Sequence, residues 1–302
     1  MVSIKISWRL RLKNCMIQFI RMLFNFERGV LMLSFLSLRL PKKRLWLAVS
    51  IALAISCLQM TQILNFIPVG ESPYTRWLSI DPFNFTPILF FILLPLIASI
   101  PAGSLLKNDA DSGLLAKVKL HSPFQKVIRS YVGIAFLSGF TILAIALLIN
   151  LLFYFTIFPN IRPDNLLNSN ILLINQNTML VGLYYAHPLL HAAISILFAS
   201  LWGGLFSVFV MVTSVWIKNS FVALSTGLCV QILVLMLNSF LTLPSLASYS
   251  PADFLHELSP NANINLTVTG IVTLLMIIYC ISLAQIGEKR LVSLDCNNKV
   301  TT

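Results

Sequence analysis

The sequence has few charged residues. Asp, Glu, Lys and Arg make up only 10% of its 302 residues, whereas they make up about a quarter of an ordinary soluble domain. Hydrophobic residues account for 57% of the chain, and the mean hydropathy is +0.86. This composition excludes an ordinary soluble domain and predicts an all-α integral membrane protein.

The sequence also lacks the motifs of several enzyme classes. It contains no HExxH, no GxSxG and no GxxxxGK[ST] phosphate loop, which would indicate a zinc protease, a serine hydrolase or a nucleotide hydrolase. Its long apolar runs carry no Asp, Glu, Lys or Arg at mid-membrane depth, which argues against a proton-coupled carrier. We therefore expect no enzyme activity, no metal and no bound cofactor on this chain.

Cysteine usage gives no disulfide framework. The five cysteines fall in predicted spans or in segments expected to be cytoplasmic, and none falls in a predicted external loop. No CxxC motif is present. Free thiols or small apolar packing residues are the simplest interpretation.

Six apolar segments approach the roughly 20 residues that are needed to cross the hydrocarbon core. The segment before them is basic, and its apolar run from 16 to 40 is interrupted by Arg21, Glu27, Arg28 and Arg39. Such a run is typical of an interfacial amphipathic helix, with a seventh span as the alternative. The predicted organisation is a basic segment 1–44, a transmembrane domain 45–284 with spans 45–66, 85–106, 131–158, 189–217, 221–243 and 266–284, and a tail 285–302.

The positions of the basic residues predict the orientation. With the N-terminus inside, Arg76 and Arg162 are the only two of the 21 Lys and Arg residues that lie outside. Because basic residues are enriched in cytoplasmic loops, both termini are expected to be cytoplasmic, in a multi-pass protein of the cell membrane.

The best-organised polar segment is the loop 107–131 between the second and third spans. Asp111 suits the N-cap of a short helix, and Ser122 and Pro123 suit the start of a second helix that continues into the third span. This loop is predicted to be a helix, a bend and another helix at the cytoplasmic surface. It can transmit force to a soluble partner, or it can be an ordinary interfacial loop near anionic lipid.

Neutral polar residues occur inside the spans. They can line a substrate path, or they can form hydrogen bonds between helices; the main ones are Gln59, Gln62, Asn150, Gln231 and Asn238. In the predicted external segments, five residues are of the types that bind metals: His187, His191, Asp253, His256 and Glu257. An interfacial helix start is the alternative explanation for His187, which precedes Pro188. A short external helix is predicted from Ser250 and Pro251 through Leu258.

Several of these features together resemble the permease subunits of type-2 ABC transporters over residues 20 to 290. The features are the interfacial Phe26, Glu27 and Arg28, six spans with both ends inside, the Asp111, Ser112, Gly113 motif in the loop between spans two and three, Lys126 and Arg129 before span three, the HPLLH start of span four, Gly203 and Gly204, Lys218 and Asn219, and the broken link between spans five and six. The family more often has Glu where Asp111 stands.

This resemblance implies an exporter in which two permease chains pair and bind two separate ATP-binding subunits, which hold the ATP and Mg²⁺. The coupling helix would lie at 112–120, and the contact with the ATPase would come from Asp111, Ser112, Gly113, Leu114, Leu115 and Val118. The cargo class would be amphiphilic or hydrophobic, such as a drug, an antimicrobial peptide or a lipid-like molecule. A non-transporting immunity or sensor protein of the membrane, which needs no ATPase, is the main alternative.

Overall fold

The computed structural model describes residues 39–64, 72–81, 84–119, 123–164, 179–244, 246–257 and 263–300. The predicted interfacial helix lies almost entirely outside these ranges. Among the described residues the chain is helical and contains no strand; the helices are α2 (Lys42–Leu64), α3 (Pro73–Arg76), α4 (Phe85–Ser99), α5 (Leu105–Asp111), α6 (Leu114–Lys119), α7 (Phe124–Ile157), α9 (Val181–Ala186), α10 (Pro188–Thr213), the 3-10 helix η1 (Ser214–Trp216), α11 (Ser220–Phe240), α12 (Pro251–His256) and α13 (Leu266–Val300).

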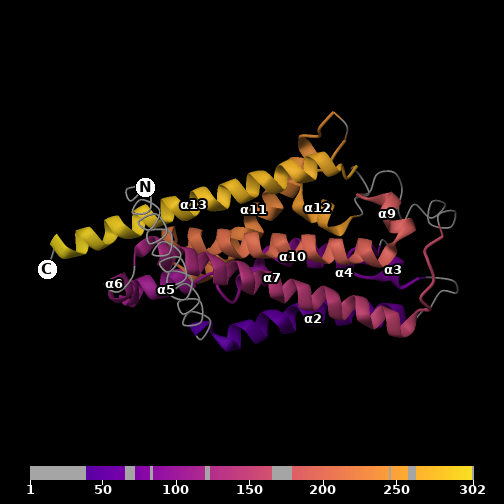
Figure 1. The fold of residues 1–302 in the computed structure, drawn as a ribbon, viewed down its shortest axis with the longest axis horizontal. Coiled ribbons are helices and arrows are strands. Elements are labelled where there is room, and N and C mark those ends of the chain that lie inside the picture. The colour runs from indigo at the N-terminus through magenta and orange to yellow at the C-terminus, as the bar shows by residue number, and fades with distance from the viewer. Residues whose placement is uncertain are drawn as a thin grey trace, which may run out of the picture.

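The long helices form an elongated bundle in which consecutive members alternate in direction (Figure 1). Helices α5 and α6 lie at the same end as the C-terminus of α13, while α3 and α9 lie at the opposite end. We call these the basic end and the far end, because the loop carrying Lys107, Lys117 and Lys126 is at the first.

Five of the described helices are long and apolar enough to cross a membrane, namely α2, α7, α10 with η1, α11 and α13. The protein is therefore a multi-pass membrane protein with an all-helical fold. The predicted second span appears as α4, which has only 15 residues and is shorter than the usual minimum of about 17. Helix α4 ends at Ser99, and Pro101 lies in the turn that follows. A proline at this position disfavours continuation of the helix, because its ring clashes with the carbonyl of the preceding helical turn.

Three other predicted boundaries differ from the structure in an informative way. The third span begins earlier, at Phe124, because its helix continues from the loop into the membrane without a stop, as predicted. The helix of the predicted sixth span continues past residue 284, since α13 is helical through Val300. The external helix α12 begins at Pro251 as expected, but it ends at His256, before Glu257 with its φ of 58°.

Helix α10 forms the centre of the bundle. It packs against α4, α7, α11 and α13. Of the residues in its most apolar 18-residue stretch, 78% are buried inside the protein, compared with 17% for α11 and 11% for α13. Its inward face is rich in small residues, which allow membrane helices to approach closely; these include Ala192, Ser195, Ala199, Ser200, Gly203, Gly204 and Ser207. The predicted close contact at Gly203 and Gly204 is confirmed, since both lie against α7.

The outer helices show the opposite pattern. Large apolar side chains are exposed along α11 and α13, among them Leu233, Phe240, Leu274 and Ile278. In water such faces would be aggregation sites, whereas in a bilayer they are in contact with acyl chains or with another membrane helix.

Candidate functional site

The α5–α6 element at the basic end is held by several polar contacts to the surrounding helices. Helix α5 ends at Asp111, Ser112 follows as its C-cap, and Gly113 has a φ of +71° before α6 starts at Leu114. A left-handed glycine directly after a helix is a common stop signal. The prediction that Asp111 is an N-cap is therefore wrong: Asp111 is the last residue of α5, and the helix that follows begins only at Leu114.

The start of α7 differs slightly from the prediction. Pro123 occupies the N-cap position itself, and the helix begins at Phe124. Ser122, the predicted cap, lies outside the described residues.

Asp109 holds α5 against the bundle. Its carboxylate accepts a hydrogen bond of 2.6 Å from the Tyr131 hydroxyl on α7, and it forms an ion pair of 3.0 Å with Arg39. The side chains of Asp109 and Tyr131 are buried, whereas Arg39 is one-third exposed. Hydrogen bonds to a charged partner are among the stronger ones in proteins, so this contact ties α5 to the first turns of α7.

Lys107 makes a second attachment. Its ammonium donates to the carbonyl oxygens of Ile217, at 2.7 Å, and Lys218. These carbonyls follow η1 at the end of α10, where the backbone of the helix no longer satisfies them. A third attachment runs from the Arg44 guanidinium of α2 to the Ser104 hydroxyl just before α5. Helix α5 is therefore connected to α2, to α7 and to the turn between α10 and α11.

The six residues predicted to contact a partner divide into two groups. Asp111, Ser112 and Gly113 are exposed at the tip of the element. Leu115 is buried in the hydrophobic core at the basic end, and Val118 packs against that core. Both Val118 and Leu114 are half-buried. The exposed surface of the tip is thus Asp111–Gly113, and the apolar residues of α6 hold this tip in place.

The structure brings together two of the five polar residues predicted as a possible path. Gln59 on α2 and Asn150 on α7 are fully buried, and the Asn150 amide donates to the Gln59 side-chain oxygen at 3.0 Å. The Gln59 amide donates in turn to Asp81 at 2.9 Å and to the Arg76 carbonyl at 3.1 Å. These contacts favour the interpretation as hydrogen bonds between helices.

The other three path residues do not join this cluster. Gln62 is exposed and accepts from Thr86 at 3.2 Å. Gln231 donates to the Phe91 carbonyl at 3.4 Å, while Asn238 donates to Asp253 at 3.1 Å and accepts from the Tyr249 amide. Each lies between α11 or α2 and a neighbouring segment.

We predict a measurable coupling between Gln59 and Asn150. Gln59→Leu and Asn150→Leu should each lower the free energy of unfolding by about 2 kcal/mol, because each leaves buried polar partners unsatisfied. The double variant should lose about 1 kcal/mol less than the sum of the two. Thermal unfolding in mild detergent measures this. The control is Thr61→Leu on α2, which is exposed and whose hydroxyl donates only to the Leu58 carbonyl of the same helix; it should change stability by under about 0.5 kcal/mol. Additive losses would contradict the cluster.

Three of the possible metal ligands at the far end contact other side chains of the protein. His191 Nε2 lies 3.2 Å from a carboxylate oxygen of Glu257, and Ser195 donates to the same carboxylate. Asp253 accepts from Ser248 at 2.6 Å and from Asn238. Among the described residues no group of three or more His, Cys, Asp or Glu side chains is placed to hold a metal.

Burial raises the pKa of the Glu257 carboxyl above its ordinary 4.5, and the nearby His191 and the Ser195 hydrogen bond oppose this effect only in part. Burial likewise raises the pKa of Asp253, against the hydrogen bond from Ser248. A raised pKa means that the folded state binds protons more tightly than the unfolded state, so stability falls as the pH rises above the ordinary pKa of each group, 3.8 for Asp253 and 4.5 for Glu257.

Glu257→Gln should therefore reduce the loss of stability with rising pH. We expect the melting temperature of the variant to fall less between about pH 4.5 and pH 7.5 than that of the unmodified protein, because one of the two groups responsible is gone. Glu288→Gln at the basic end is the control, with the same chemical change. Parallel pH profiles for all three proteins would contradict the assignment to Glu257.

Comparison with protein-family models, with curated proteins and with solved structures finds no match to this chain.

Proposed function

We propose that the chain is the transmembrane permease subunit of an ATP-driven exporter, which moves an amphiphilic or hydrophobic cargo across the cell membrane with energy from a separate ATPase subunit. One observation carries the proposal. The α5–α6 element presents an exposed tip, Asp111–Gly113, and is fixed to the helices behind it through Asp109 and Lys107.

The attachments suit transmission of force from the tip into the bundle. A partner that moves the tip also moves α5, and with it Tyr131 on α7 and the carbonyls of Ile217 and Lys218 between α10 and α11. Since α7 and α10 pack along much of their length around Gly139 and Gly203, a displacement at the basic end would change the angle between the central helices. Alternation between two such arrangements is the general principle of a gated membrane path.

The remaining parts of the proposal follow from charge and from the exposed apolar faces. The basic end faces the cytoplasm, where Lys and Arg residues gather and where an ATPase is present. ATP and Mg²⁺ bind to that partner, because this sequence has no phosphate-binding loop. A second permease chain packs against part of the exposed apolar surface of the outer helices.

Co-purification tests the proposal. The tagged chain is isolated in mild detergent from the cells that normally make it, with and without crosslinking, and associated proteins are identified by mass spectrometry. We expect an ATPase with the unmodified chain, and its loss from an Asp111→Arg, Ser112→Trp variant. Both positions are exposed, so this variant should fold, whereas a substitution at the buried Leu115 would confuse contact with stability.

Ile161→Trp is the matched control. It adds the same bulky side chain at an exposed position of the far end and should retain the ATPase. If no ATPase accompanies the unmodified chain even after crosslinking, the permease proposal fails, and a membrane immunity or sensor protein becomes the leading interpretation.

A further inference from the structure

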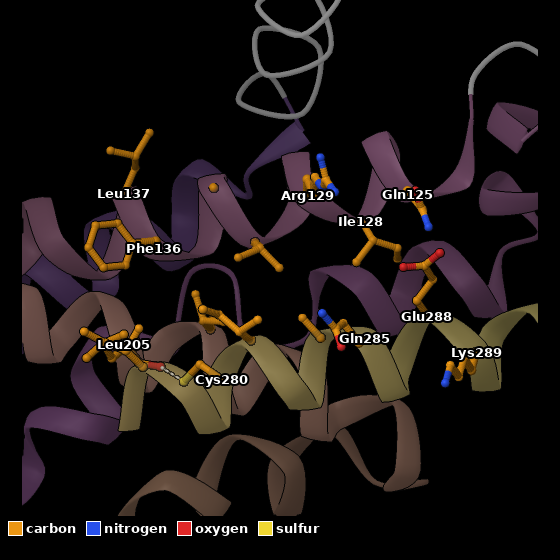
Figure 2. A pocket seen from close by; sticks show the side chains of 16 residues that line it. Gln125, Ile128, Arg129, Phe136, Leu137, Leu205, Cys280, Gln285, Glu288 and Lys289 are labelled. Atoms are coloured by element: carbon orange, nitrogen blue, oxygen red, sulfur yellow. Dashed lines mark hydrogen bonds between the residues drawn. The ribbon is translucent and has the colours of Figure 1, made fainter. Parts of the chain in front are cut away.

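A cavity of about 770 Å³ lies between α7 and α13 near the basic end, with Leu205 and Val208 of α10 at its base. Figure 2 shows side chains of both helices pointing toward one another across it. The volume is within the range of small-molecule sites. Neither the α5–α6 element nor any of the five polar residues discussed above contributes to its lining.

The cavity is polar at one end and apolar along the rest. On α7, Gln125 and Arg129 precede Gly133 and Leu137; on α13, Glu288 and Lys289 follow Ile281. Because the two helices run in opposite directions (Figure 1), their polar residues meet at the same end. Figure 2 shows Gln125 and Arg129 on α7 and Glu288 and Lys289 on α13 toward the same end of the two helices, away from Phe136 and Leu205, with Glu288 pointing toward α7.

This arrangement has the dimensions of one membrane leaflet. The twelve helical steps from Gln125 to Leu137 on α7 correspond to about 18 Å at 1.5 Å per residue, and half of the hydrocarbon core is about 15 Å. Since 125–129 precede the predicted third span at 131–158 and 288–289 follow the predicted sixth span at 266–284, the polar end is expected at the depth of lipid headgroups, with the apolar part toward the middle of the bilayer.

The charge at the polar end favours an anion. The exposed Arg129 and Lys289 carry two positive charges, and Glu288 carries one negative charge, which leaves the opening net positive. Basic side chains near the membrane surface attract anionic headgroups. The apolar walls, in contrast, suit an acyl chain rather than a polar solute.

We propose that this groove binds an anionic phospholipid taken from the bilayer, with its headgroup at the polar end, where Arg129 and Lys289 supply positive charge, and one acyl chain along Gly133, Phe136 and Ile281. The proposal goes beyond the permease function and does not depend on it, because a lipid bound here would bridge α7 and α13 whether or not an ATPase is attached. It predicts that the packing of α13 against α7 depends on anionic lipid.

The test uses the full chain in nanodiscs that contain a photoactivatable phosphatidylglycerol, followed by mapping of the crosslinked peptides. We expect crosslinks to 125–137 or 277–289, and competition by unlabelled phosphatidylglycerol but not by phosphatidylcholine. Arg129→Gln with Lys289→Gln should weaken competition by phosphatidylglycerol roughly 10- to 30-fold, since two headgroup attractions are lost.

Lys42→Gln with Lys43→Gln is the matched control. It removes the same charge from exposed positions on α2, which does not line the groove, and should leave competition unchanged. Gly133→Phe should abolish the groove crosslink by filling the space. Equal effects of the two double variants, equal competition by both lipids, or lipid crosslinks that fall mainly outside 125–137 and 277–289 would overturn the proposal.

Discussion

Gly139→Leu should destabilise the bundle more than any other single substitution at a glycine facing another helix. A Cβ atom at Gly139 would lie 2.5 Å from the carbonyl oxygen of Gly203 and 2.8 Å from the Ser207 Cβ. The obstacle is backbone, which cannot rotate away, so α7 and α10 would have to separate. Overpacking usually costs about 1–3 kcal/mol, and we expect about 3 kcal/mol or more here. In mild detergent the melting temperature should fall by roughly 6–12 °C.

Gly270→Leu is the control for this prediction. Gly270 also lies in a membrane helix, on α13, but a Cβ atom there would meet nothing within 4 Å. Since leucine forms helices better than glycine by about 1 kcal/mol, this variant should be neutral or slightly stabilised. If both variants melt at the same temperature, close contact between α7 and α10 is not a main source of stability.

The same pair of helices shows what the sequence can and cannot predict. Gly203 and Gly204 are adjacent in a long apolar run, and small residues in such a run indicate close helix packing. Gly139 gives no comparable signal, because its role depends on which helix lies opposite, and nothing in a single sequence aligns position 139 with position 203. Helix existence follows from apolar length, whereas the register between helices follows from three-dimensional packing.

The loop between α4 and α7 shows a second kind of difference. The mixture of acidic, apolar and basic residues predicts one short helix at 112–120, and α6 (Leu114–Lys119) confirms it, whereas α5 was not predicted. The start of the first helix was misplaced because Asp111 followed by apolar residues satisfies the pattern of an N-cap. The competing signal was Gly113, which is also typical of a helix end. Residues 105 and 106 were assigned to the end of the second span and 107–110 to the loop before the predicted helix, so α5 was missed.

The buried polar contacts were predictable only as a class. Neutral polar residues inside spans indicate hydrogen bonds between helices or a polar path, and Gln59 with Asn150 is of the first kind. Their 91-residue separation in sequence is not visible as a motif. For the same reason neither the Tyr131–Asp109 hydrogen bond nor the pairing of His191 with Glu257 could be read from the chain.

Asp109→Asn should loosen the α5–α6 element from the bundle without removing its tip. The substitution keeps the size of the side chain but replaces a charged acceptor for the Tyr131 hydroxyl by a weaker one and removes the partner of Arg39. A hydrogen bond to a charged group contributes about 1.5–3 kcal/mol. We expect the free energy of local opening to fall by about 2 kcal/mol, which is roughly a 30-fold faster hydrogen exchange in 105–119.

Asp111→Asn separates this effect from a general change of charge. It alters the same side chain type two residues away, at a position that is exposed, and should leave hydrogen exchange in 105–119 unchanged. If the tip transmits force as proposed, Asp109→Asn should also retain the associated ATPase while lowering transport, because the contact surface is intact and its attachment is not. Equal exchange rates in the two variants would show that Asp109 does not hold the element, and the mechanical part of the proposed function would then lose its structural basis.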